Sequence, residues 1–212
     1  LSLWYNNFFD YRTHAIIPYS ENLKSFSKYL QQASMESNGK QTDRSNNLIE
    51  YQTGQIIWGQ TGTNAQHSFF QLLHQGSKII PCDFIGFCNS ITSKKNHHDI
   101  LMANFFAQTK ALMLGTSDEK VESNHKLFKG NRPTNTILID KLTPESLGSL
   151  ISMYEHKIFT LGVIWNILSF DQFGVELGKK LATNILQDIE NHDFSNHDSS
   201  TKNLLKRYLS TD

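Results

Sequence analysis

The chain has 212 residues, of which 38% are hydrophobic and 19% charged, proportions typical of a soluble globular protein with one sizeable core. Lys and Arg together number 20, and Asp and Glu also number 20, so no net charge attracts nucleic acid, a membrane surface or a basic partner. The two cysteines, Cys82 and Cys88, are too few for a disulfide framework or a structural zinc site of paired cysteines, and we expect a reduced, cytoplasmic setting.

Two apolar stretches of the chain could form a leader or a membrane span. Residues 1–9 contain no initiator Met, basic leader or cleavage site, and we expect them to continue a helix that begins upstream. The longest apolar stretch, 147–170, carries Glu155, His156 and Lys157 at its centre, where charges are most costly in a bilayer. We therefore expect a buried or interface helix there and no contact with a membrane.

Short strand-like runs alternate with longer helical runs, which is typical of helices packed around a parallel sheet. The first half of the chain predicts these elements in order: a helix at 21–34, a tight turn at 36–40, a strand at 55–58, a glycine-containing loop at 59–64 and a helix at 66–74. Strand, loop and helix in this order often form a ligand site.

The second half repeats this order. It predicts a strand at 78–81, a helix at 98–114, a polar surface segment at 115–130, a strand at 135–139 and helices at 173–190 and 202–209. Thr143 and Pro144 indicate the start of a further long helix, because Thr caps a helix and Pro fits its first position. We predict an α/β fold with a doubly wound parallel sheet flanked by helices, and a helical C-terminal extension.

Polar residues near the predicted element ends allow more than one interpretation. Gln32 and Glu36 are four residues apart and can face one cleft, although a solvated helix end is the simpler explanation. His67 and His74 share a helical face, but no acidic or thiol ligand accompanies them at zinc-like spacing, so packed or surface histidines are the simpler explanation. Lys179 lies three residues after Glu176, which is equally compatible with an exposed ion pair.

A resemblance to a known family changes this balance. The segment 162–179 reads Gly-Val-Ile-Trp, four further residues and then Phe-Asp-Gln-Phe-Gly-Val-Glu-Leu-Gly-Lys, and it resembles the C-terminal signature of the glucose-6-phosphate isomerases without a break. Other segments resemble the same family in chain order: 32–40, 52–54, 58–67, 81–84, 104–109, 130–135, 154–159 and 197–201. The family usually has Gly-Glu-Pro-Gly-Thr-Asn-Gly-Gln-His where this chain has Gln60, Thr61 and Ala65.

The resemblance implies an activity and the residues that perform it. Family members interconvert glucose 6-phosphate and fructose 6-phosphate without a metal or organic cofactor, by opening the ring and moving a proton between C2 and C1 through a cis-enediol(ate). Carried over by position, Glu36 is the base that moves the proton, and His67 and Lys179 take part in ring opening. Gln32 binds the substrate through its amide, and Gln172 helps to hold the phosphate.

The resemblance also implies how the chain is organised. The fold is that of a sugar-isomerase (SIS) domain, with the ligand at the C-terminal ends of the strands. We expect 1–140 to form this domain, truncated at its start, and 141–212 to supply a long helix, the signature helix and a tail that pack on the domain and on a dimer partner. Family members are longer, so we expect that an N-terminal domain is missing here and that this chain holds only part of the active site. His67 is then shared into the partner's site.

Two other classes of protein remain open. One is a non-catalytic module of the same fold that only binds sugar phosphates, and such a module would lack a matched base. The other is a fragment that docks to another domain. The presence of Glu36, His67 and Lys179 together favours the isomerase.

Overall fold

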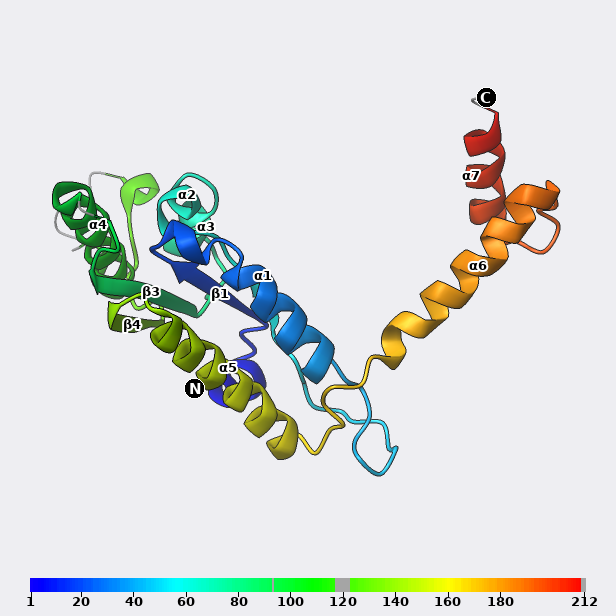
Figure 1. The fold of residues 1–212 in the computed structure, drawn as a ribbon, viewed down its shortest axis with the longest axis horizontal. Coiled ribbons are helices and arrows are strands. Elements are labelled where there is room, and N and C mark those ends of the chain that lie inside the picture. The colour runs from blue at the N-terminus through cyan, green and yellow to red at the C-terminus, as the bar shows by residue number, and fades with distance from the viewer. Residues whose placement is uncertain (93, 117–122, 211–212) are drawn as a thin grey trace. The chain divides into compact units, whose positions relative to one another are not determined.

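The computed structural model describes residues 1–92, 94–116 and 123–210. The chain divides into two compact units, Leu1–Phe170 and Asp171–Asp212 (Figure 1). The first contains the sheet and most of the predicted elements, and the second is helical. The polar segment predicted at 115–130 includes residues 117–122, which lie outside the described residues.

A four-stranded parallel sheet forms the centre of the first unit (Figure 1). The strands are β1 (Thr13–Pro18), β2 (Ile56–Trp58), β3 (Cys82–Asn89) and β4 (Thr134–Lys141), and their order is β2-β1-β3-β4. In β1, Ala15 pairs with Trp58 on one side and with Cys82 on the other. Later strands thus lie on both sides of the first, which is the doubly wound arrangement, and the predicted fold class is confirmed.

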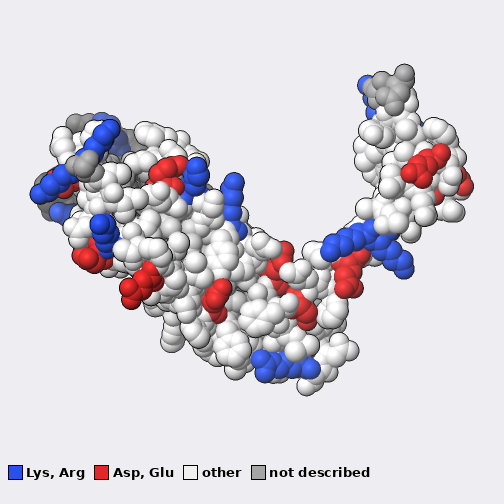
Figure 2. All heavy atoms as spheres, viewed as in Figure 1, with Lys and Arg blue, Asp and Glu red and all other residues white. Residues whose placement is uncertain are grey.

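Helices connect and follow the strands of this unit. They are η1 (Trp4–Phe8), η2 (Glu21–Leu23), α1 (Phe26–Gln31), η3 (Gln32–Glu36), α2 (Gly62–Gln66), α3 (Phe70–Gln75), α4 (Lys95–Leu114), η5 (Asn124–Lys126) and α5 (Pro144–Ile164). None of the helices in the described ranges is long and apolar enough to cross a membrane. Acidic and basic side chains are interspersed on the face of the first unit seen in Figure 2, as the balanced charge of the whole chain leads one to expect.

The sheet separates two hydrophobic clusters because neighbouring side chains along a strand point to opposite faces. Ile16 of β1 and Ile85 of β3 lie in one cluster with residues of α1 and α5. Ile17 and Phe84 lie in the other, with residues of α2, α3 and α4. Both faces of β1 are therefore covered, which explains why nearly the whole strand is buried.

Helix α5 begins as its sequence predicts. Thr143 Oγ1 accepts a hydrogen bond from the Ser146 backbone N–H at 3.1 Å, and Ser146 Oγ accepts one from the Thr143 N–H at 2.8 Å. This capping box satisfies two backbone groups that the helix itself cannot pair. Strands near 55–58 and 135–139 and a helix near 98–114 are also confirmed.

The structure differs from the expected strands in two places. The strand expected at 78–81 is wrong, because β3 begins only at Cys82, the first residue of this segment that pairs in register with β1. Pro81 lacks an N–H and contributes only its carbonyl, which accepts from the Ala15 N–H at 2.9 Å. Strand β1 itself was not predicted, since its six residues follow an aromatic run with helical spacing.

The second unit consists of η6 (Phe173–Val175), α6 (Glu176–Asn191) and α7 (Ser199–Leu209). Asp198 caps α7, with its Oδ1 accepting from the backbone N–H groups of Ser200 at 2.9 Å and Thr201 at 3.1 Å. His197 Nε2 lies 3.0 Å from Asp188 Oδ2, which joins the start of α7 to α6. The predicted helical C-terminal extension is thus confirmed.

Candidate functional site

Glu36 lies near the end of a helical run that changes geometry along its length. Helix α1 passes directly into the π-helical turn η3, and the run continues to Asn38. Helical residues therefore extend beyond the predicted end at Ser34. Gln32 is exposed and Glu36 is half-buried, so both reach the surface. Single π turns are rare in proteins, and those that do occur often lie at functional sites.

Tertiary contacts hold this π turn beside the start of β2. Met35 Sδ accepts a hydrogen bond from the backbone N–H of Ile57 at 3.4 Å. A Cβ on Gly54 would lie 2.8 Å from the Asn38 carbonyl oxygen, so only glycine permits this approach. Because Gly54 precedes β2, Glu36 lies at the amino edge of the sheet.

His67 occupies the opposite edge. It follows the carboxyl end of β2 and stands at the end of α2, exposed to solvent. The single helix predicted at 66–74 is in fact two short helices, with His67 in the turn between them. A Cβ on Gly62 would lie 2.2 Å from the ring of Tyr19, so glycine allows α2 to pack closely on the residue that follows β1.

The three departures from the family's usual loop are accommodated locally. Ala65 is fully buried in the cluster beneath α2. Thr61 is also buried, and its Oγ1 accepts from Asn64 Nδ2 at 3.1 Å. Gln60 is exposed. The loop packs with these residues in place and leaves His67 at the surface.

The structure therefore brings Gln32 and Glu36 together but separates them from His67. Helix α1 runs from the carboxyl end of β1 back to the amino end of β2, whereas α2 follows the carboxyl end of β2. The expected ligand position at the carboxyl ends of the strands fits His67 and not Glu36. Within one copy of this unit, the two side chains face different edges of the sheet.

Gln172 and Lys179 belong to the second unit. Gln172 precedes the short helix η6, and Lys179 lies in the first turns of α6. Both are exposed. The sequence signature that contains them thus continues from the end of the first unit into the start of the second.

The metal-site interpretation of the two histidines receives no support from the described residues. His74 is buried, its Nε2 lies 2.8 Å from Gln108 Oε1, and its ring packs edge-on against Phe128. Within 1–92, 94–116 and 123–210, no three His, Cys, Asp or Glu side chains form a group that could hold a metal ion. His74 is a packed histidine, as the simpler explanation held.

A buried polar network at the centre of the sheet was not predicted. Asp83 Oδ1 lies 3.0 Å from His14 Nε2 and accepts from Asn135 Nδ2 at 2.7 Å. Asp83 Oδ2 accepts from the Tyr154 hydroxyl at 2.8 Å. Burial alone would raise the pKa of the Asp83 carboxyl, but His14, Lys157 and Asn135 together hold this pKa below its usual range. Asp83 therefore remains ionised inside the sheet.

This network joins three of the segments that resemble the isomerase family. Asp83 lies in 81–84 and Tyr154 in 154–159, while Asn135 ends the segment 130–135. A lone Asp within an apolar strand is the signal that could have indicated it, because a buried charge requires partners. These segments stabilise the fold through this network.

Replacing Tyr154 by Phe is expected to lower the free energy of unfolding by about 1–3 kcal/mol, because a buried carboxylate oxygen loses its donor. Urea denaturation at neutral pH measures this change. Tyr29→Phe is the matched control, since the Tyr29 hydroxyl donates to Glu155 Oε1 at 2.6 Å at the surface, where such a contact contributes at most about 1 kcal/mol. Equal losses in the two variants would contradict the importance of the buried contact.

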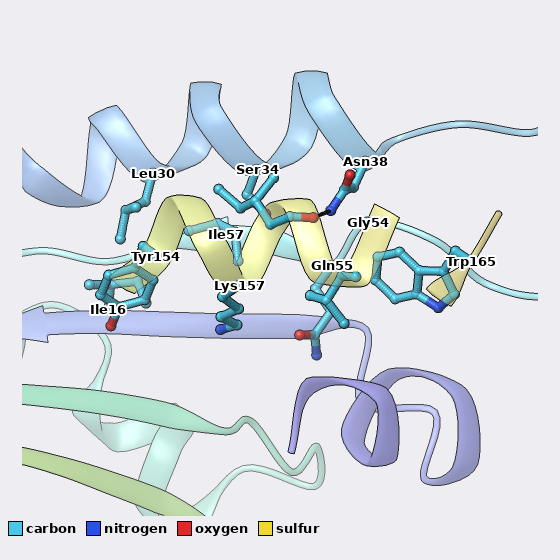
Figure 3. Close-up of a pocket in the computed structure, with 12 residues that line it drawn as sticks. Ile16, Leu30, Ser34, Asn38, Gly54, Gln55, Ile57, Tyr154, Lys157 and Trp165 are labelled. Carbon is cyan, nitrogen blue, oxygen red and sulfur yellow. Dashed lines mark hydrogen bonds between the residues drawn. The ribbon is translucent and has the colours of Figure 1, made fainter. Parts of the chain in front are cut away.

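A pocket lies between the helical run that carries Glu36, helix α5 and strands β1 and β2 (Figure 3). Most of its lining is apolar, with residues such as Ile57, but the Lys157 side chain also enters it from α5. Burial lowers the pKa of Lys157, although Asp83 opposes this shift. Neither Gln32 nor Glu36 lines the pocket, so it is not the cleft expected around the candidate base.

The parallel sheet and its two helical layers define a doubly wound α/β domain. A crystal structure of a glucose-6-phosphate isomerase from Chlamydia trachomatis is similar, with a TM-score of 0.85 and 40% identity over all of this chain and 40% of that one. A hypothetical protein from Thermus thermophilus, with a TM-score of 0.62 and 22% identity over 84% of this chain and 42% of its own, shares the fold.

Sequence comparisons identify the family. The family model described as phosphoglucose isomerase matches residues 1–205, and the chain belongs to this family. It is 57% identical to a glucose-6-phosphate isomerase of Christiangramia forsetii, over 99% of this chain and 42% of the relative. It is 55% identical to one of Gloeobacter violaceus, over 98% of this chain and 40% of the relative. The chain thus spans about two fifths of the length of these curated relatives.

Proposed function

We propose that the protein to which this chain belongs interconverts glucose 6-phosphate and fructose 6-phosphate. The observation that carries the proposal is the π turn that presents Gln32 and half-buried Glu36 together, in a chain similar along its whole length to glucose-6-phosphate isomerases. The curated relatives bear the name of the enzyme, which favours catalysis over a binding module or a docking fragment.

In the proposed reaction, Glu36 moves a proton between C2 and C1 through a cis-enediol(ate). A carboxylate can both accept and return a proton, and Gln32, exposed on the same helical run, can hold a sugar hydroxyl. His67 and Lys179 take part in ring opening, and the Lys179 cation can stabilise developing negative charge. Gln172 helps to hold the phosphate.

We further propose that the enzyme is a homodimer in which His67 completes the partner's site. The support is geometric: Glu36 lies at the amino edge of the sheet and His67 at the carboxyl edge, so one copy does not direct both side chains at one sugar. The ring of His67 is exposed and can reach groups outside the chain.

The longer relatives also suggest how the chain is divided into domains. We propose that 1–140 belongs to the sugar-isomerase domain and that 141–212 supplies helices that pack on it and on the dimer partner. Helix α5 supports packing of the later segment on this domain, because its residues Leu150 and Tyr154 lie in the hydrophobic cluster that contains Ile16 and Ile85 of the sheet. The relatives extend well beyond this chain, which supports a further domain that completes the site.

An isomerase assay on the complete enzyme and on the 212-residue chain alone tests the proposal. We expect turnover by the complete enzyme and negligible turnover by the chain, because binding energy from the rest of the site is needed to position the reacting carbons. Circular dichroism of the chain controls for folding. No isomerisation by the complete enzyme would contradict the proposed activity, and normal turnover by the chain would contradict a divided active site.

A further inference from the structure

Asn38 ends the helical run that carries Glu36, and only 1% of its surface is exposed. Its Nδ2 donates to the backbone carbonyl of Ile158 in α5 at 2.9 Å, the contact drawn in Figure 3. Its Oδ1 accepts from Ser169 Oγ at 2.7 Å. A buried amide engaged at both ends has one favourable orientation. The last turn of the run is therefore fixed to two other segments.

Gly162 of α5 provides the space for these contacts. A Cβ at this position would lie 2.0 Å from Ser169 Oγ and 3.2 Å from Asn38 Oδ1. A side chain at this position would displace the Ser169 hydroxyl, so the contact between Ser169 and Asn38 requires glycine here. Gly148, in the same helix, is different, because a Cβ there would meet nothing within 4 Å.

Further hydrogen bonds join the segment after α5 to the segment after Glu36. The Tyr51 hydroxyl donates to the carbonyl of Trp165 at 2.5 Å. Arg44 donates twice, from its backbone N–H to the Asn166 carbonyl at 2.8 Å and from Nε to the Ile167 carbonyl at 3.2 Å. The contact between Ser169 and Asn38 is thus the last of a series along this segment.

We propose that Asn38, Ser169 and Gly162 form a positioning lock that fixes the end of the π turn and thereby the carboxylate of Glu36. The inference rests on the proposed role of Glu36 as the base. Proton transfer requires the base within hydrogen-bond reach of the proton, so a small displacement of the turn slows the reaction without removing any group that touches the substrate.

Ser169 also lies close to the end of the first unit. Ser169 stands two residues before Asp171, where the second unit begins. That unit carries Gln172 and Lys179. The hydrogen bond from Ser169 to Asn38 therefore joins the last residues of the first unit to the helical run that carries Glu36.

Ser169→Ala and Gly162→Ala, made in the complete enzyme, test the lock. The first removes one hydroxyl, and the second places a methyl group where the hydroxyl lies. Ser27→Ala is the matched control for the first, because Ser27 Oγ is buried on the same helical run and donates to the Ile16 carbonyl at 3.1 Å. Gly148→Ala is the control for the second. Each variant is assayed for kcat, KM, melting temperature and deuterium exchange at C2 of the sugar.

We expect Ser169→Ala and Gly162→Ala to lower kcat and C2 exchange by about 10- to 100-fold, the loss that a displacement near 1 Å can cause, with KM nearly unchanged. Ser27→Ala should lower the melting temperature as much as Ser169→Ala but keep kcat, and Gly148→Ala should keep both. If Ser169→Ala and Ser27→Ala have the same kcat, the lock is disproved. The comparison of Ser169→Ala with Ser27→Ala remains decisive even if Gly162→Ala fails to fold.

Glu36→Gln in the same assays separates this inference from the proposed function. If Glu36→Gln abolishes C2 exchange while Ser169→Ala behaves as Ser27→Ala does, only the lock is overturned. If Glu36→Gln exchanges at the normal rate, Glu36 is not the base, and the proposed mechanism is overturned together with the lock that depends on it.

Discussion

Glu36→Gln in the complete enzyme is expected to keep much of the substrate affinity and to lose isomerisation by about two to four powers of ten, the usual contribution of a positioned general base. Glutamine preserves the shape of the side chain but does not accept a proton. The contact of Lys40 Nζ with the backbone carbonyl of residue 36, at 2.7 Å, does not depend on the side chain and remains.

Deuterium exchange at C2 of the sugar is the direct measurement, because it reports proton removal even when product release is slow. Glu50→Gln is the matched control, since Glu50 is exposed in the loop before β2 and has no proposed role. Exchange at the normal rate in Glu36→Gln would show that the base lies elsewhere, and an equal loss in Glu50→Gln would show that the loss is not specific to Glu36.

Mixing two inactive variants is expected to restore activity if His67 serves the partner's site. In a two-fold dimer of Glu36→Gln and His67→Ala subunits, one site receives both substitutions and the other receives neither. Random mixing of equal amounts makes about half of the dimers mixed, so about a quarter of all sites are repaired. Activity should rise toward roughly that fraction of wild type, while each variant alone stays low.

The experiment is to denature the two complete variants, mix them, refold them and assay isomerisation, with each variant refolded alone as the control. If His67 served its own chain, every site in a mixed dimer would keep one substitution. A mixture no more active than the average of the two controls would therefore rule out a shared site.

Elements set by neighbouring residues could be predicted from the sequence, whereas elements set by distant residues could not. The first residue of helix α5 could be predicted, because Thr143 caps the helix through backbone groups close to it in sequence and Pro144 fits the first helical position. Strand β1 could not be, because its burial depends on pairing with β2 and β3, which are far away in sequence. The same dependence sets the start of β3, because Cys82 is the first residue of its segment that pairs in register with β1.

The candidate site followed from resemblance more than from physical pattern. Spacing alone could not distinguish Glu36 from a solvated helix end, since the π turn depends on tertiary contacts such as that of Met35 with Ile57. It also could not place Glu36 and His67 at opposite edges, because that separation results from the direction of α1 relative to the strands. The role of Asn38 depends on Ser169, a residue distant in sequence.

The strand order has a consequence for how the chain folds during synthesis. Strand β1 can pair with β2 once Trp58 has been made, but its other edge stays unpaired until residues 82–85 of β3 follow. An unpaired edge of a hydrophobic strand is a site of aggregation, and pairing between distant segments is slow. Strand β1, which is almost wholly buried in the native sheet, therefore keeps one edge unpaired while residues 59–81 are made, and a chaperone that covers this edge would reduce aggregation of the nascent protein.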